Sequence, residues 1–135
     1  MKKEWSNKWS SSRQPRKQRK FRHNAPMHVR QKFVSAHLST PLKNRFEKRS
    51  LPLRKGDEVM VMRGGSRGFK GKIERIDLKH ERVFIEGLNV KKVDGTEVLK
   101  PLRPSNLMIT EAKMDDKRRQ MIVERSRNKE EKSDK

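Results

Sequence analysis

The sequence contains no cysteine and few apolar residues. Without cysteine, the chain has no disulfide framework, no thiolate zinc site and no cysteine nucleophile. Apolar residues make up 30% of its 135 positions and charged residues 40%, so only part of the chain is expected to pack on itself. It has no apolar run long enough to span a bilayer and no signal-peptide core after Met1. These absences favour a cytoplasmic, soluble chain with one modest domain, some extensions and no membrane insertion.

Positive charge is what the sequence has in excess. Lys and Arg number 37 against 17 Asp and Glu, which gives a net charge of +20. Residues 1–50 contain 15 basic and 2 acidic side chains, a net charge of +13. A chain this basic repels itself when it is free, so it implies a polyanionic partner, either nucleic acid or an anionic membrane.

No motif indicates catalysis or a cofactor. The four histidines lack the spacing of a helical metal site and have no thiolate to join them; they are His23, His28, His37 and His80. Acidic residues are scattered without an acid/base pair, and Asp57 and Glu58 are interpreted as the start of a strand. We therefore expect no enzyme activity, no metal or other cofactor and no small-molecule substrate.

The N-terminal segment, residues 1–24, has almost no apolar periodicity. It lacks the side chains that would offset the entropy of ordering, so we expect it to be disordered when free and ordered by its partner. Phe21 lies within a run of basic residues and is a candidate for stacking on RNA bases. For Trp5 and Trp9 alone, the interpretation as part of a solvated arm is preferred.

Residues 24–38 and 39–50 each predict a short helix with a proline in its first turn. Asn24 is the expected cap of the first. In the second, Leu42 and Phe46 stand four apart on one face. The two helices are expected to dock by their apolar stripes and to expose basic faces.

Residues 51–110 predict five short strands of a small, strongly bent barrel. The apolar positions change parity between Ile73 and Ile76, which indicates a bulge there. Asp94-Gly95 is the expected two-residue turn of a hairpin. After the last strand, residues 114–135 predict a helix capped by Asp115 or Asp116, with Met121, Ile122 and Met114 on a thin apolar face and a disordered end over residues 128–135.

The glycine-rich stretch RGGSRGFKG, from Arg63 to Gly71, matches neither phosphate-binding motif. A Walker loop would need a glycine where Ser66 stands and a hydroxyl where Ile73 follows Lys72, and the glycines also lack the dinucleotide G-x-G-x-x-G spacing. The stretch alone is equally consistent with a tight turn and with a loop that lets a nucleic-acid backbone approach closely. The charge of the N-terminal segment favours RNA.

The stretch KGDEVMVMRGGSRGFKGKIERID, Lys55 to Asp77, resembles the KOW motif, with Gly71 at the position of its hallmark glycine. The flanks QPRKQRKFRHNAPMHVRQKFVSAHLS, EGLNVKKVDGTEVLKPLRPSNLMIT and DDKRRQMIVERS extend this likeness to residues 13–126. Over that length the chain resembles the universal large-subunit ribosomal protein twenty-four family, called twenty-six in eukaryotes, in its archaeal form. MKKEWSNKWSSS does not resemble a family feature.

The resemblance implies a mainly β fold: a small SH3-like barrel with short N-terminal helices, an arm that is disordered when free and a C-terminal helix. It implies a structural protein that binds large-subunit ribosomal RNA near the polypeptide exit tunnel, contacts neighbouring large-subunit ribosomal proteins and supports assembly. The segments expected are 1–24, 25–50, 51–110 and 111–135. The predicted RNA-binding residues are Arg16, Lys17, Arg19, Lys20, Phe21, Arg22, His28, Arg30, Lys32, Arg63, Gly64, Ser66, Arg67, Gly68, Lys70, Gly71 and Lys72.

Two other functions fit parts of the sequence. A KOW-type transcription elongation or RNA-processing factor would need a polymerase-binding domain, for which residues 1–50 are too basic and too poor in apolar residues. An anionic-membrane binder would need an amphipathic helix with a large apolar face. Neither predicted helix, over 24–38 or 114–127, has one.

Overall fold

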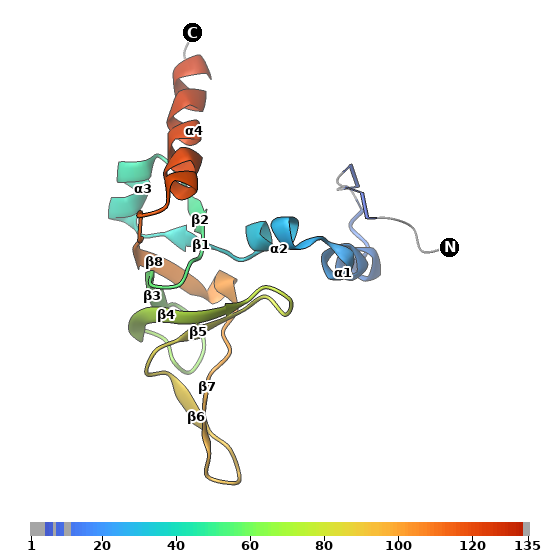
Figure 1. Cartoon of the computed structure of the whole chain (residues 1–135), viewed down its shortest axis with the longest axis vertical. Coiled ribbons are helices and arrows are strands. Elements are labelled where there is room, and N and C mark those ends of the chain that lie inside the picture. The colour runs from blue at the N-terminus through green and yellow to red at the C-terminus, as the bar shows by residue number, and fades with distance from the viewer. Residues whose placement is uncertain (1–4, 7, 10–11, 134–135) are drawn as a thin grey trace.

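The computed structural model of the chain describes residues 5–6, 8–9 and 12–133, with side chains described as far as residue 125 (Figure 1). Its helices are α1 (Pro15–Asn24), α2 (Met27–Phe33), α3 (Thr40–Phe46), the 3-10 helix η1 (Pro104–Asn106) and α4 (Lys117–Ser133). Its strands are β1 (Ser35–Leu38), β2 (Ser50–Pro52), β3 (Glu58–Val61), β4 (Lys70–Asp77), β5 (Arg82–Ile85), β6 (Asn89–Lys91), β7 (Glu97–Leu99) and β8 (Leu107–Glu111). The fold is therefore mixed α/β, where a mainly β fold was expected.

Six strands form one sheet in the order β2-β1-β8-β3-β4-β5, and β6 pairs with β7 in a separate hairpin. β1 runs parallel to β8, while the other neighbouring pairs are antiparallel. The predicted bulge is confirmed, since the register of β4 against β5 shifts between Ile73 and Arg75. Figure 1 shows α4 and the hairpin at opposite ends of the molecule, with α1 and α2 extending to one side of the sheet.

The core consists of alternate residues of the central strands. Val59, Val61, Ile73, Val83, Ile85, Leu107 and Ile109 are each at most 1% exposed. A strand with one face on a core reads as alternating buried and half-buried positions, which is the pattern of β3 and β5. The predicted strands over β3, β4, β5 and β8 are therefore confirmed.

The helix predicted over residues 24–38 is wrong at both ends. Asn24 ends α1, and α2 begins only at Met27, after Pro26 at the N-cap position. The last residues form β1, in which Ala36 and Leu38 are buried and pair along β2 and β8. Because strands lie on both sides of this short segment, its backbone N–H and C=O groups find hydrogen-bond partners when it is a strand. α2 contacts β2, and α3 contacts β1 and α4, so the two helices do not dock mainly on each other as expected.

The helix predicted after Ser39 is confirmed as α3. Ser39 stands at the N-cap position and Pro41 in the first turn, where a missing N–H costs nothing. Phe46 is buried and Leu42 packs against the same core, as their spacing of four predicts. The helix stops at Glu47, which adopts a left-handed conformation with φ 51°.

The N-terminal segment differs from its predicted disorder, because residues 15–24 form α1. Pro15 suits the first turn. Trp5 and Trp9 pack on Phe21 with ring centroids 5.1 and 5.2 Å apart. These aromatic contacts join residues 16 and 12 positions apart, so local apolar periodicity did not indicate them.

The turn of the β6–β7 hairpin is longer than predicted. Lys92 and Thr96 still pair through a backbone hydrogen bond of 2.9 Å, which leaves three residues, 93–95, in the loop. Gly95 has φ 84°, and Asp94 accepts hydrogen bonds from the backbone and hydroxyl of Thr96. A three-residue loop with glycine in the left-handed position is the next most common hairpin connection.

The C-terminal helix was predicted with the wrong end, and its apolar face was predicted in part. Asp116 caps it as expected, accepting a hydrogen bond of 2.8 Å from the backbone N–H of Arg118, and this bond is the main reason that the pKa of Asp116 lies below its usual value. The helix continues to Ser133, so the predicted disorder of the end is wrong over those residues, and 134–135 lie outside the described part. Ile122 and Met114 pack against the core as predicted, whereas Met121 is half exposed and the buried apolar residue of the helix is Val123.

Candidate nucleic-acid interface

The glycine-rich stretch forms a closed loop between β3 and β4. Gly64 and Gly68 have φ of 91° and 87°, which few other residues adopt. The loop is held by its own backbone: the N–H of Gly68 donates to the carbonyl of Val61 at 2.8 Å, and that of Arg67 to the carbonyl of Gly64 at 3.1 Å. A Cβ added at Gly64, Gly65 or Gly68 would meet no other atom within 4 Å. The loop is therefore a fixed shape whose glycine backbone is open to a partner.

Gly71 differs from the other glycines of the stretch, because it lies in β4 opposite Val59. A Cβ built on it would lie 2.7 Å from Cγ2 of Ile85 and 3.2 Å from Cε1 of Phe69. Phe69 itself packs partly buried against the core, which is the alternative to base stacking that the sequence left open. The requirement for glycine at position 71 thus comes from packing inside the protein.

The charged side chains of the loop face solvent: Arg63, Arg67, Lys70 and Lys72 are all exposed. Ser66 is half-buried and accepts a hydrogen bond of 2.8 Å from Nζ of Lys100, which follows β7. This contact fastens the loop to the opposite segment of the chain.

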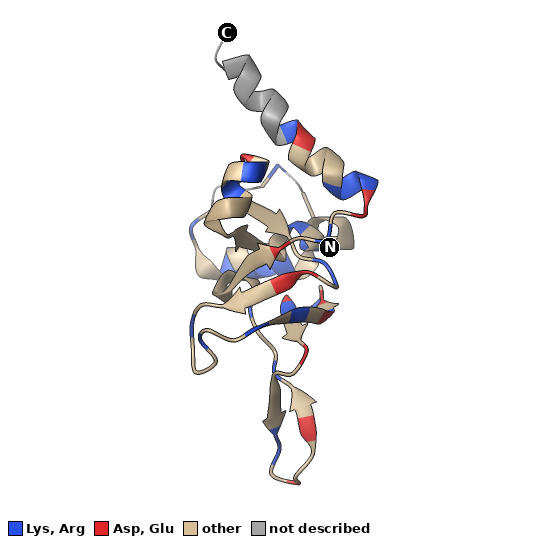
Figure 2. Ribbon diagram, turned by 90° about the vertical axis from the view of Figure 1, so that its left-hand side faces the viewer, with Lys and Arg blue, Asp and Glu red and all other residues tan. Residues whose placement is uncertain are grey.

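Basic residues of α3 and its neighbours act on the same histidine as the start of this loop, which the sequence did not indicate. The pKa of His37 in β1 is lowered first by burial and then by the positive charges of Lys43, Arg49 and Arg63. Lys43, Arg49 and the loop residue Arg63 are therefore all close enough to His37 to act on its imidazole. Figure 2 shows Lys and Arg on α3 and on the loops between the strands.

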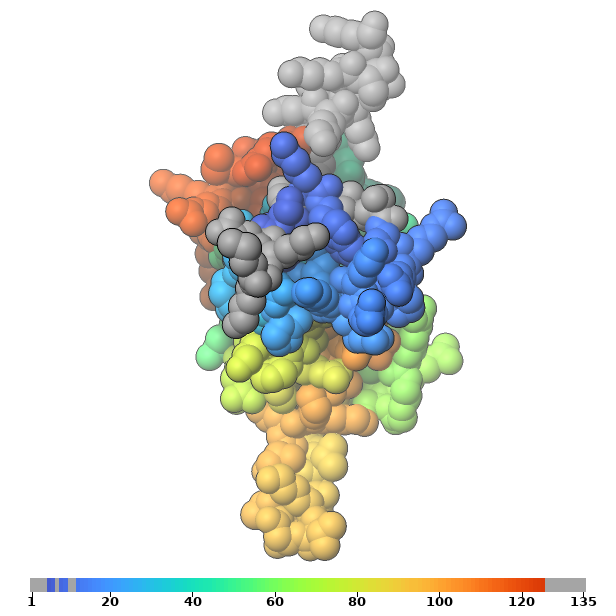
Figure 3. All heavy atoms as spheres, turned by 90° about the vertical axis from the view of Figure 1, so that its right-hand side faces the viewer, coloured from blue at the N-terminus to red at the C-terminus, as the bar shows by residue number. Residues whose placement is uncertain are grey.

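The basic residues of α1 divide into two groups. Arg16, Lys17, Arg19 and Lys20 are exposed. Arg22 is exposed as well, but it forms an ion pair of 2.9 Å with Glu81 and lies over the ring of Phe33 at 5.5 Å. It therefore ties α1 to the turn between β4 and β5, below the arm in Figure 3.

Arg30 in α2 is also occupied inside the chain. Its guanidinium donates to the carbonyls of Ala25 at 2.9 Å, of Lys79 at 3.3 Å and of His23. His28 and Lys32, on the same helix, are exposed. Phe21 is half-buried among Trp5, Trp9 and Phe33 rather than free on the surface. The N-terminal helices are thus held by aromatic and β4–β5 turn residues, whereas the glycine loop is held by its own backbone and by Lys100.

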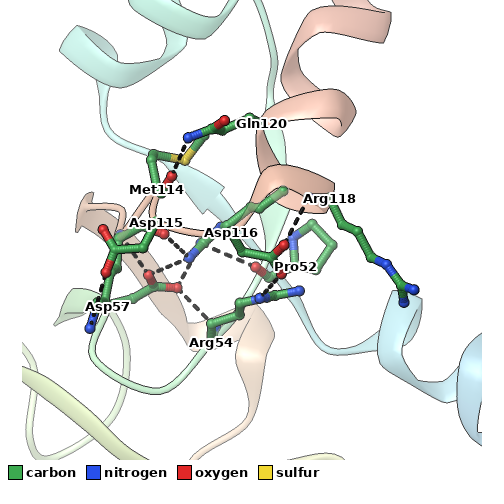
Figure 4. A network of polar contacts seen from close by, with 10 residues as sticks. Pro52, Arg54, Asp57, Met114, Asp115, Asp116, Arg118 and Gln120 are labelled. Carbon is green, nitrogen blue, oxygen red and sulfur yellow. Dashed lines mark hydrogen bonds and ion pairs between the residues drawn. The ribbon is translucent and has the colours of Figure 1, made fainter.

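A buried ion pair fixes α4 to the sheet (Figure 4). Two nitrogens of Arg119 donate to the two carboxylate oxygens of Asp57 at 2.6 and 2.7 Å, and both residues are at most 1% exposed. Asp57 also accepts from the backbone N–H groups of Arg54 and Lys113, each at 2.9 Å. Arg119 donates further to the carbonyls of Lys113 and Pro52. Asp57 stands just before β3, as predicted, but its partner 62 positions later was not foreseen.

Comparison with known proteins places the chain in a family. Residues 12–126 match the family of ribosomal proteins described as L26 in eukaryotes and as L24 in archaea. The chain belongs to this family. Its ribosomal character agrees with the predicted resemblance and with the prediction that the chain is not an enzyme.

Three archaeal relatives, each a large ribosomal subunit protein uL24, are similar to this chain over most of its length. The one from Methanosphaera stadtmanae is 48% identical over 84% of this chain and 97% of its own length. That from Methanothrix thermoacetophila is 47% identical over 84% and 98%. That from Methanocella arvoryzae is 48% identical over 85% and 93%.

The described residues provide neither a candidate metal site nor a candidate membrane-spanning helix. Within that part of the chain, no three His, Asp or Glu side chains gather so that they could hold a metal ion. No helix formed by the same residues is both long and apolar enough to cross a membrane.

Proposed function

We propose that this chain is a structural protein of the large ribosomal subunit, which binds ribosomal RNA near the polypeptide exit tunnel and supports assembly of the subunit in the cytoplasm. The observation that carries the proposal is its identity of 47–48% with three large ribosomal subunit proteins uL24 over almost their whole length. RNA binding rests on charge neutralisation by the exposed cations of the loop and of α1.

The predicted RNA-binding residues form three functional groups in this proposal. Arg16, Lys17, Arg19 and Lys20, with His28 and Lys32, supply phosphate contacts from exposed positions of α1 and α2. Arg63, Arg67, Lys70 and Lys72 do so around the open backbone of Gly64 and Gly68, with Ser66 holding the loop in place. Arg22, Arg30, Phe21 and Gly71 give the binding surface its shape through contacts inside the chain.

We also propose that the sheet closes as an SH3-like barrel. Support comes from the register shift in β4 and from an isolated bridge between Val83 and Leu102, which brings β5 to the segment before η1. Around it, we propose that residues 1–24, 25–50 and 111–135 serve as separate attachments of a central unit, 51–110. The β6–β7 hairpin, with Val90, Val93 and Val98 exposed, is suited to contact a neighbouring large-subunit protein.

The salt dependence of RNA binding tests the proposal. The logarithm of affinity for a large-subunit RNA fragment should fall with the logarithm of salt by roughly 0.7–0.9 per phosphate contact. Replacing Arg67 and Lys70 together by Gln should reduce that slope by about 1.4–1.8 if each makes one contact. Lys113→Gln, at a side chain that pairs with Asp115 at 3.3 Å, is the matched control.

Chemical footprinting of the RNA in whole subunits would locate the contacts. A flat salt response, or recovery of the chain with RNA polymerase and not with large subunits, would contradict the proposed function.

A further inference from the structure

The two tryptophans precede the segment that matches the family, which begins at residue 12, yet they form part of a defined pocket. The pocket has a volume of about 380 Å³, and its lining includes Trp5, Trp9, Lys17, Lys20, Phe21 and Asn24. A volume near the lower end of the range for ligand pockets, about 300–1,000 Å³, suits one small planar group.

The aromatic wall of this pocket is positioned by specific contacts. Nε1–H of Trp5 donates to the backbone carbonyl of Phe21 at 3.1 Å, which fixes one indole on α1. The ring of Phe21 is tilted by 31° and 32° to the two indoles. Both tryptophans remain half-buried, so the rings reach the pocket without filling it.

Two cations stand beside the aromatic wall. Lys17 and Lys20 lie three positions apart on α1, hence on one face of the helix, and both are exposed. Asn24, one turn further, adds an amide that can donate and accept hydrogen bonds. No Asp or Glu among the described residues lines the pocket.

We propose that this pocket binds one unpaired nucleotide of RNA, with its base stacked on the indoles and its flanking phosphates on Lys17 and Lys20. Aromatic side chains stack on splayed bases in single-stranded RNA, while lysines neutralise the backbone. An acidic peptide would satisfy the lysines and leave the aromatic faces unused, so the combination favours a nucleotide. The inference deepens the proposed function and rests on it, because it assigns a base-binding role to residues that precede the segment matched to the family.

Intrinsic fluorescence provides a selective test. The chain has two tryptophans and no tyrosine, so tryptophan emission reports on this pocket alone. A short single-stranded RNA should quench the emission of the full-length protein with saturation. An oligonucleotide with the same phosphates but abasic residues should bind weakly and leave the emission almost unchanged. Equal quenching by the two, or saturable quenching by an acidic peptide and not by RNA, would overturn the proposal.

Trp9→Ala should weaken binding of the base-containing oligonucleotide by about tenfold, with Trp5 still reporting. Trp9→Phe should restore most of the affinity, and thermal unfolding should be the same for all three proteins. If Trp9→Ala binds as tightly as the parent chain, the pocket is not a base site. The proposed function is tested separately by measuring, on the same proteins, how binding of a large-subunit RNA fragment depends on salt. If Trp9→Ala still binds this fragment with a steep salt dependence, the proposed function holds even when the pocket is not a base site.

Discussion

Two regions of the molecule contain basic side chains that serve opposite purposes. One is the junction between α4 and the sheet, and the other is the N-terminal arm, residues 5–24. At the junction, Arg119 is 1% exposed and is paired on both terminal nitrogens with Asp57. In the arm, Arg16, Lys17 and Arg19 are exposed to solvent.

The difference shows that the surroundings of a basic residue decide its role, more than the local density of charge. Arg119 follows Lys117 and Arg118 in a run as basic as the arm, yet a carboxylate and two backbone carbonyls meet it inside the protein. Arg22 stands between these extremes, since Glu81 pairs with it at a partly exposed position. The first and last of the following four changes test this division directly, and the two between them test packing and titration at sites next to the basic residues; they are ordered by their expected effect on the free energy of unfolding.

Removing the buried carboxylate should have the largest effect. Asp57→Ala leaves Arg119 charged and buried without its partner, which should lower the free energy of unfolding by about 3–5 kcal/mol. Urea unfolding measures this loss. The matched control is Asp115→Ala, whose partner Lys113 is 58% exposed; that change should cost about 0–1 kcal/mol. Equal losses in the two variants would show that burial of the pair does not matter.

Filling the space at Gly71 should rank second. Gly71→Ala places a Cβ 2.7 Å from Ile85, so the sheet must shift, at a cost of about 1–3 kcal/mol in unfolding free energy. Gly65→Ala, where a Cβ meets nothing within 4 Å, should change stability by less than about 0.5 kcal/mol. Thermal unfolding of both variants checks the difference, and a destabilised Gly65→Ala with an intact Gly71→Ala would reverse the assignment.

A smaller effect on the free energy of unfolding is expected from the titration of His37. Because the pKa of His37 is lowered in the folded protein, the unfolded chain takes up a proton at higher pH than the folded chain. The contribution of His37 to the free energy of unfolding is therefore fully present above its ordinary pKa of 6.5. This contribution is lost as the pH falls from 6.5 through the lowered pKa of the folded protein. His37→Gln should flatten this part of the curve in urea unfolding measured between about pH 5 and 8. An unchanged curve would show that another group controls it.

Charge removal in the arm should have the smallest effect on stability. Replacing Arg16, Lys17, Arg19 and Lys20 by Gln together should leave the unfolding free energy unchanged within about 0.5 kcal/mol. The salt slope of RNA affinity should nevertheless fall by about 3 if each contacts one phosphate. A large loss of stability with an unchanged slope would place these side chains in the same class as Arg119.

The sequence predicted those parts of the fold whose signal is local. Val59 and Val61 alternate within one strand, and Leu42 and Phe46 repeat within one helix, so β3 and α3 were found. β1 was missed because its four residues follow a helical segment and become a strand only by pairing with β2 and β8. The pairing with β8 joins Leu38 to Ile109, and no local pattern carries such a contact.

The candidate site was predictable to a similar extent. The exposed cations of the glycine loop follow from charge and turn residues alone. The engagement of Arg22 by Glu81, and of Arg30 by the carbonyl of Lys79, depends on how α1 and α2 lie against the β4–β5 turn. Gly71 was recognised by its place in a motif, whereas the atoms that exclude a side chain there belong to β5 and Phe69.

The position of β8 between β1 and β3 has a consequence for synthesis. β1 and β3 have no shared neighbour until β8 is available, so the sheet stays in two unconnected halves until residues 107–111 have been synthesised. Asp57 remains without its ion-pair partner for longer, because Arg119 is synthesised after β8, which ends at Glu111. The native fold can thus be completed only after Arg119 has been synthesised, and any earlier association with RNA must be made by the arm and the unfinished halves.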